Sequence, residues 1–75
     1  MRETTFGERA VGLDFNPSND ATVTLLKQSF ADVIDVLNVI RDEANDPETK
    51  RLASVAITEA QGAQMWAVKA ATWEK

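Results

Sequence analysis

The sequence contains no cysteine, no histidine, and only two prolines and three glycines among its 75 residues. Without cysteine there can be no disulfide, thiolate zinc site or cysteine nucleophile, and without histidine the commonest general base is missing. No long apolar run occurs, so we expect neither a membrane span nor a secretory signal. The scarcity of proline and glycine beside 44% hydrophobic residues predicts a folded chain.

The charge is unbalanced toward the acidic side, with eight basic and twelve acidic residues and a net charge of -4. This sign opposes non-specific binding to DNA, RNA or anionic lipid, so we expect no nucleic acid and no membrane among the partners. A chain of this length holds one domain, residues 1–75, and buries only about 60% of its surface, so small domains often need a staple or a partner subunit. We therefore expect a homo-oligomer.

Residues 19–44 show the apolar spacing of a helix that packs along its whole length. The gaps alternate between three and four residues, at Val23, Leu26, Phe30, Val33, Leu37 and Ile40. Ser18, Asn19 or Asp20 can cap its start. Leu25, Val36 and Val39 lie off this stripe, and we expect them to form a subunit contact.

A second helix is predicted over residues 47–73, after a short break in which Asp46 can cap and Pro47 can open the helix. So short a break predicts an antiparallel helical hairpin. The same three-four spacing is filled by alanine alone, which would let the two backbones approach closely, at Ala53, Ala56, Ala60, Ala63, Ala67 and Ala70. Large side chains border this seam on other faces, which again favours an oligomer, among them Leu52, Val55, Met65, Trp66, Val68 and Trp73.

Residues 1–18 have no sustained period, and we expect an ordered arm or loop. Its end, from Phe15 through Asn16, Pro17 and Ser18, leads directly into a helix start, which offers free N–H groups to an anion. Phe15 could stack on a base, and Arg9 and Lys27 could add positive charge. The alternative is that Ser18 and Asn19 only cap the helix while Phe15 fastens the arm to the hairpin.

Lys69 lies between Trp66 and Trp73 in sequence, where it could contact phosphate or simply pack over the indole rings. Paired carboxylates such as Asp42 and Glu43 are typical of a solvated helix face. The sequence shows no nucleophile set, phosphate loop or calcium loop. We therefore expect no enzyme, no metal site and no cofactor.

Most of the chain resembles a known family. In the second predicted helix the resemblance rests on an opening arginine, an Ala-x-Thr step, a glutamine, a methionine and a basic residue followed by alanine, here Arg51, Ala56, Thr58, Gln61, Met65, Lys69 and Ala70. The segments Gly7–Leu13 and Phe15–Ser18 add to it. The chain is similar to the small helical-hairpin domain of phage proteins that sequester the cyclic-nucleotide signals of CBASS and Thoeris immunity.

This resemblance implies an all-α hairpin with an N-terminal arm, assembled into a compact homo-oligomer, typically a hexamer. It implies binding of cyclic dinucleotides, and possibly cyclic trinucleotides or cyclic ADP-ribose isomers, in pockets between protomers and without cleavage. Such a sponge acts in the cytoplasm of the infected bacterial host. By the same resemblance, Phe15 would stack on a base and Lys27 would contact phosphate.

The residues expected to bind the ligand lie in two sets. The first comprises Phe15, Asn16, Pro17, Ser18 and Lys27, and the second comprises Arg9, Thr58 and Lys69. The alternative function is a small acidic helical oligomer that inhibits a host protein by covering its binding surface, with no nucleotide ligand.

Overall fold

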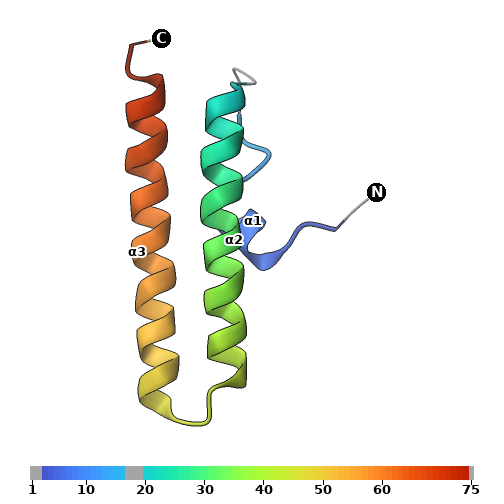
Figure 1. The fold of residues 1–75 in the computed structure, drawn as a ribbon, viewed down its shortest axis with the longest axis vertical. Coiled ribbons are helices and arrows are strands. Elements are labelled where there is room, and N and C mark those ends of the chain that lie inside the picture. Colours follow the sequence, from blue (N-terminus) through green and yellow to red (C-terminus); the bar gives the residue numbers. More distant parts are fainter. Residues whose placement is uncertain (1–2, 17–19, 75) are drawn as a thin grey trace.

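The computed structural model describes residues 3–16 and 20–74, and every regular element in these two ranges is a helix (Figure 1). The helices are α1 (Phe6–Val11), α2 (Ala21–Glu43) and α3 (Pro47–Thr72). The two long helices lie side by side and antiparallel, and the short α1 lies against α2 about midway along its length. The expected hairpin is present, while the oligomeric state remains a prediction.

Each helix begins at a side chain that accepts hydrogen bonds from free backbone N–H groups. The Asp20 carboxylate accepts bonds from Thr22 and Val23 at the start of α2, and Asp46 accepts one from Thr49 at the start of α3. Pro47 opens α3, where its missing N–H costs nothing. Of the three caps considered for α2, Ser18 and Asn19 lie outside the described residues.

The segment expected to be an ordered arm or loop contains the short helix α1, and a capping box opens this helix. The Glu8 N–H donates to the Thr5 hydroxyl, and the Thr5 N–H donates to the Glu8 carboxylate. Gly12 ends the helix with a φ of 63°, in the left-handed region that glycine enters without strain. The sequence carries both signals, Thr-x-x-Glu and a following glycine, which a search for long apolar periods does not detect.

α2 turns inward a face that only partly matches the one its apolar spacing predicted, since Val23 of that stripe is buried and Phe30 and Leu37 pack against the core. Ala31 and Ile34 are fully buried, whereas Val33 and Ile40, expected in the seam, are 51% and 44% exposed. α2 carries apolar residues on several faces, so periodicity alone does not select one of them. The inward face is the one that meets both other helices, since α1 approaches α2 at Ala31 and Ile57 of α3 joins the same core.

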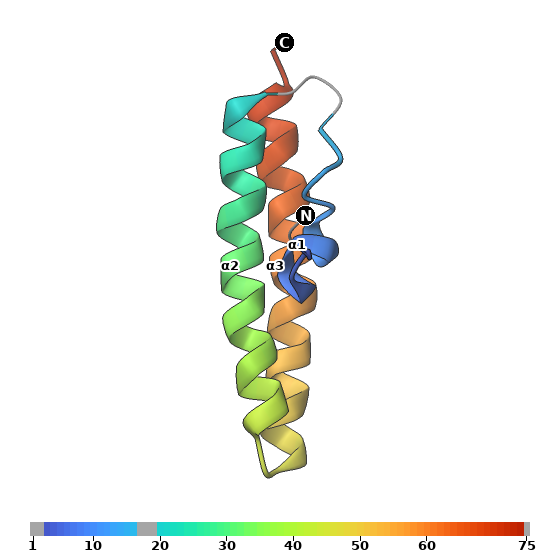
Figure 2. The same cartoon turned by 90° about the vertical axis from the view of Figure 1, so that its right-hand side faces the viewer.

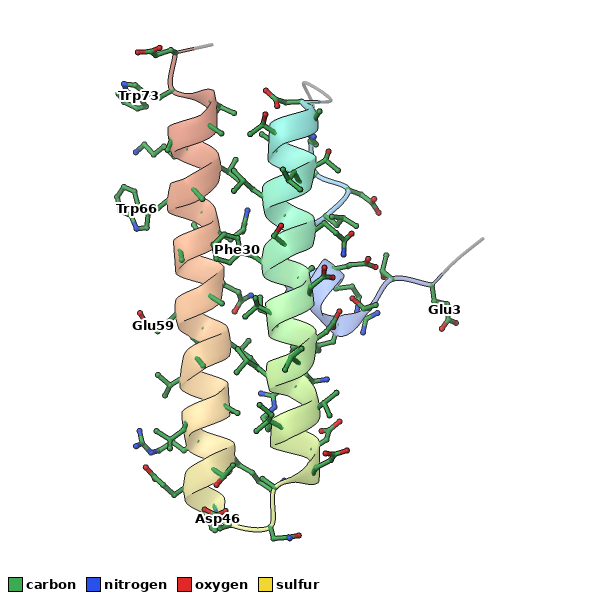
Figure 3. All side chains as sticks on the ribbon, viewed as in Figure 1. Glu3, Phe30, Asp46, Glu59, Trp66 and Trp73 are labelled. Carbon is green, nitrogen blue, oxygen red and sulfur yellow. The ribbon has the colours of Figure 1, made fainter. Side chains whose placement is uncertain are left out.

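The alanine seam of α3 is likewise only partly buried. Ala53 is buried, but Ala63 and Ala70 are exposed, and the inward line contains Ile57 and Gln64 in their place. Figure 3 shows Phe30 between the two long helices, where it packs beside the buried core. The prediction of an all-alanine contact was therefore wrong, because larger side chains fill the space between α2 and α3.

The molecule is a thin plate that measures 45 × 30 × 12 Å. Its smallest dimension is close to the diameter of one helix with its side chains, about 10–12 Å. Figure 2 shows that α1 covers only the middle of the hairpin. Much of each long helix therefore has no covering layer among residues 3–16 and 20–74, and many large apolar side chains are exposed, including Leu25, Val36, Val39, Leu52, Met65, Trp66 and Trp73.

Candidate functional site

α1 docks on α2 through contacts that only a glycine permits. The Gly7 N–H donates to the Asp35 carboxylate at 2.7 Å, and a Cβ at Gly7 would lie 2.1 Å from the Ala31 carbonyl oxygen. On the other long helix, the Gln61 side-chain amide donates to the Ala10 carbonyl at 3.0 Å. Both long helices thus fix α1, and through it the start of the loop that follows.

The loop after α1 is short and held by its own hydrogen bonds. Leu13 N–H donates to the Glu8 carbonyl and Phe15 N–H to the Gly12 carbonyl. The Asn16 side-chain amide donates to the Asp20 carbonyl and the Thr24 hydroxyl, each at 2.9 Å. These bonds connect the loop to the first turn of α2.

Lys27 is buried beneath this loop, with 5% of its surface exposed. Its Nζ donates to the carbonyl oxygens of Gly12, at 2.9 Å, and of Phe15. The same Nζ lies 5.4 Å from the centroid of the Phe15 ring. Phe15 itself is 75% exposed, so its ring does not fasten the arm to the hairpin. The chain is fastened there by the Lys27 ammonium.

The start of α2 is less open to an anion than we expected. The Asp20 carboxylate already accepts the N–H groups of Thr22, at 2.7 Å, and Val23, at 3.3 Å. A bound phosphate would meet the negative charge of this carboxylate, which offsets the favourable helix dipole. Pro17 and Ser18, also expected in the site, lie outside the described residues.

The remaining expected ligand residues lie elsewhere. Arg9 is exposed on α1 and donates to the Thr4 carbonyl at 2.6 Å. Thr58 and Lys69 are exposed on α3, where eleven residues separate them by about 16 Å along the helix axis. The structure therefore brings Phe15, Asn16 and Lys27 together, and it leaves Arg9, Thr58 and Lys69 at other positions.

A second surface feature lies on the outer side of α3. Lys69 Nζ is 5.4 Å from the Trp66 ring and 5.6 Å from the Trp73 ring. A shallow hollow of about 280 Å³ is lined by Gly62, Met65, Trp66 and Lys69. Figure 3 shows both indoles on the side of α3 that faces away from α2.

No group of three or more residues that could hold a metal ion occurs in residues 3–16 and 20–74. No helix within the same ranges is long and apolar enough to cross a membrane.

Neither the curated proteins nor the solved structures include a match to this chain. A family model described as "Acb2/Tad1, hairpin domain" matches residues 8–72, which include α2, α3 and most of α1. This match covers most of the chain and confirms the resemblance found in the sequence, so the chain belongs to the Acb2/Tad1 hairpin family of anti-CBASS and anti-Thoeris sponges.

Proposed function

We propose that this protein binds cyclic oligonucleotide second messengers and holds them without cleavage, so that they cannot activate anti-phage effectors of the host. The family match over residues 8–72 carries the proposal, because this family consists of sequestering sponges. The proposed ligands are cyclic dinucleotides. Cyclic trinucleotides and cyclic ADP-ribose isomers are further candidates. The mechanism is stoichiometric, so the protein must be at least as abundant as the signal.

Phe15 is the proposed stacking platform for a base. Its ring is largely exposed while its backbone is fixed by the bonds of the loop. A rigid backbone with a free aromatic face limits the entropy lost on binding, and base stacking is worth about 1–3 kcal/mol per base. Asn16, Pro17 and Ser18 complete this part of the proposed site.

Phosphate contacts are proposed for three of the exposed donors, Arg9, Thr58 and Lys69. Thr58 and Lys69 of one subunit are about 16 Å apart along α3, so they do not converge on one phosphate. A pocket between protomers would bring copies of them together. The uncovered faces of the plate favour such an oligomer, since large apolar side chains are exposed on both long helices.

The first experiment is isothermal titration with a panel of cyclic dinucleotides, cyclic trinucleotides and cyclic ADP-ribose isomers. Each bound ligand is then released by heat and identified by chromatography. Tight binding with intact recovery supports the sponge, whereas recovery of a cleaved product contradicts it. Light scattering after size-exclusion chromatography measures the oligomer, and a monomer at micromolar concentration contradicts a pocket between protomers.

Phe15→Ala tests the stacking role. We expect it to weaken binding by about 5- to 150-fold, since the loss of one stacked base is worth about 1–3 kcal/mol. Trp66→Ala is the matched control, because it removes an aromatic ring of similar exposure from α3. Wild-type affinity in Phe15→Ala, together with lost affinity in Trp66→Ala, would move the base contact to α3.

The alternative is an interaction module that inhibits a host protein. The exposed apolar residues on both long helices favour it as the second candidate. No binding across the whole nucleotide panel, with a large apolar surface still exposed in the oligomer, would support this function over the sponge.

A further inference from the structure

Lys27 has the surroundings of a buried structural cation. Only 5% of its surface is exposed, and two of the three ammonium donors go to the carbonyl oxygens of Gly12 and Phe15. Burial of an ammonium is costly unless polar partners replace its water. Two carbonyl dipoles and the face of the Phe15 ring supply such partners here.

The two carbonyl groups belong to the first and last residues of the turn from Gly12 to Phe15, which presents the Phe15 ring. Gly12 ends α1, and Phe15 lies three residues further on, linked back to Gly12 by its own N–H. One ammonium therefore joins both ends of this turn to the second turn of α2, twelve and fifteen residues away in sequence. The bonds involve backbone oxygens, so they constrain the chain and leave the Phe15 ring exposed.

We infer that Lys27 is a positioning residue, which holds the Gly12–Phe15 turn on α2 so that the Phe15 ring faces the ligand, and that it does not itself bind phosphate. The ligand in this inference rests on the proposed function. The fixing of the turn rests on the burial and hydrogen bonds of Lys27. It predicts that the effect of Lys27 on binding passes through Phe15. A direct phosphate contact predicts instead that the two residues contribute independently.

Amide hydrogen exchange tests the turn without any ligand. In Lys27→Met we expect exchange at the Phe15 and Asn16 amides to rise about tenfold, since hydrogen bonds to a charged group are among the stronger ones. Amides in the middle of α3 should keep their wild-type rates, which shows that the variant is folded. Lys69→Met is the matched control, because it removes an exposed lysine that also lies over aromatic rings. Unchanged exchange at Phe15 in the folded Lys27→Met protein would overturn the inference.

A double-mutant cycle tests the route to the ligand, with the tightest-binding member of the panel as the probe. Lys27→Met should weaken binding about tenfold in the wild-type protein but less than twofold in a Phe15→Leu background, because coupled residues are not additive. Lys27→Arg, which can still donate to the two carbonyl groups, should recover most of the affinity. An equal loss in both backgrounds would show a direct phosphate contact and overturn the inference.

A failure of the proposed function can be distinguished from a failure of the inference about Lys27. If the wild-type protein binds no member of the panel, the proposed function is contradicted. Hydrogen exchange still decides whether Lys27 fixes the turn, because that measurement needs no ligand.

Discussion

In the described part of the chain two lysines lie over aromatic rings, Lys27 and Lys69, and their surroundings differ completely. Lys27 Nζ lies 5.4 Å from Phe15, and Lys69 Nζ lies 5.4 Å from Trp66. Lys27 is buried and donates to two backbone carbonyl groups of a distant loop, whereas Lys69 is exposed beside aromatic residues of its own helix. Equal distance to a ring therefore says little about role. Burial and hydrogen-bond partners separate a residue that fixes the fold from one that is available at the surface.

The largest effect is expected from two glycine substitutions. One is at Gly7, where α1 docks on α2, and the other is at Gly62, in the hollow beside Lys69. Gly7→Ala should destabilise the protein by about 2–3 kcal/mol, since overpacking in a close contact has this cost and the new Cβ would lie 2.1 Å from the Ala31 carbonyl oxygen. Gly62→Ala, with nothing within 4 Å of its added Cβ, should stabilise α3 by about 0.5–1 kcal/mol. Urea unfolding followed by circular dichroism measures both. Equal effects of the two variants would contradict the docked position of α1.

The lysines themselves give the next largest effect. Lys27→Met should lower the free energy of unfolding by about 1–2 kcal/mol, because two buried carbonyl oxygens lose a charged donor. Lys69→Met should change it by less than about 0.5 kcal/mol, as is usual for an exposed substitution. Urea unfolding at neutral pH measures the difference. Similar losses of stability in the two variants would contradict the contrast between a buried, stabilising Lys27 and an exposed Lys69.

The smallest effect is expected in acid, at the hairpin turn. Hydrogen bonds from the Thr49 hydroxyl and N–H hold the pKa of Asp46 below its ordinary value of 3.8. The Arg51 guanidinium, 2.7 Å away, likewise lowers the pKa of Glu48 from 4.5. Because both values are lowered by folding, these groups stabilise the protein above about pH 4.5. Their contribution is lost as the pH falls through the folded-state values.

Thermal unfolding between pH 7 and pH 3 measures this loss, which we expect as a small fall in melting temperature. The double variant Asp46→Ser/Glu48→Gln keeps a capping hydroxyl but has no titrating carboxylate at the turn. It should show a flatter acid profile than the wild type. A profile that stays unchanged would mean that other carboxylates account for the acid sensitivity.

The sequence allowed the hairpin to be predicted well, and the site only in part. Asp46 and Pro47 mark the start of α3 because capping and proline geometry act within one turn of helix. The contacts of Lys69 with Trp66 and Trp73 are also local, since residues three and four apart on a helix are neighbours. Phe15 was identified as a candidate, but nothing near it in sequence indicates that Lys27 is buried under its backbone. That contact joins positions twelve residues apart.

Gly7 and Gln61 were not among the expected site residues, although both fix the element that carries the site. Gly7 is linked to Asp35 over 28 residues, and Gln61 to Ala10 over 51. The capping box at Thr5 and Glu8 was a usable signal for α1, but it does not tell where the helix will dock. Such contacts depend on the relative placement of whole helices, which no local pattern specifies.

The sequence by itself determined that this chain forms two long helices joined by a short turn, because helix periodicity, caps and breaks act over a few residues. Tertiary structure alone decided which faces of those helices are buried, since α2 and α3 each present several overlapping apolar stripes. Docking of α1 and α3 against α2 selected among them and placed Ala31 and Ile34 inside, with Val33 outside. The same docking buried Lys27 beneath the loop and left Phe15 exposed, because one ammonium can satisfy two backbone oxygens only when the helices are already in place.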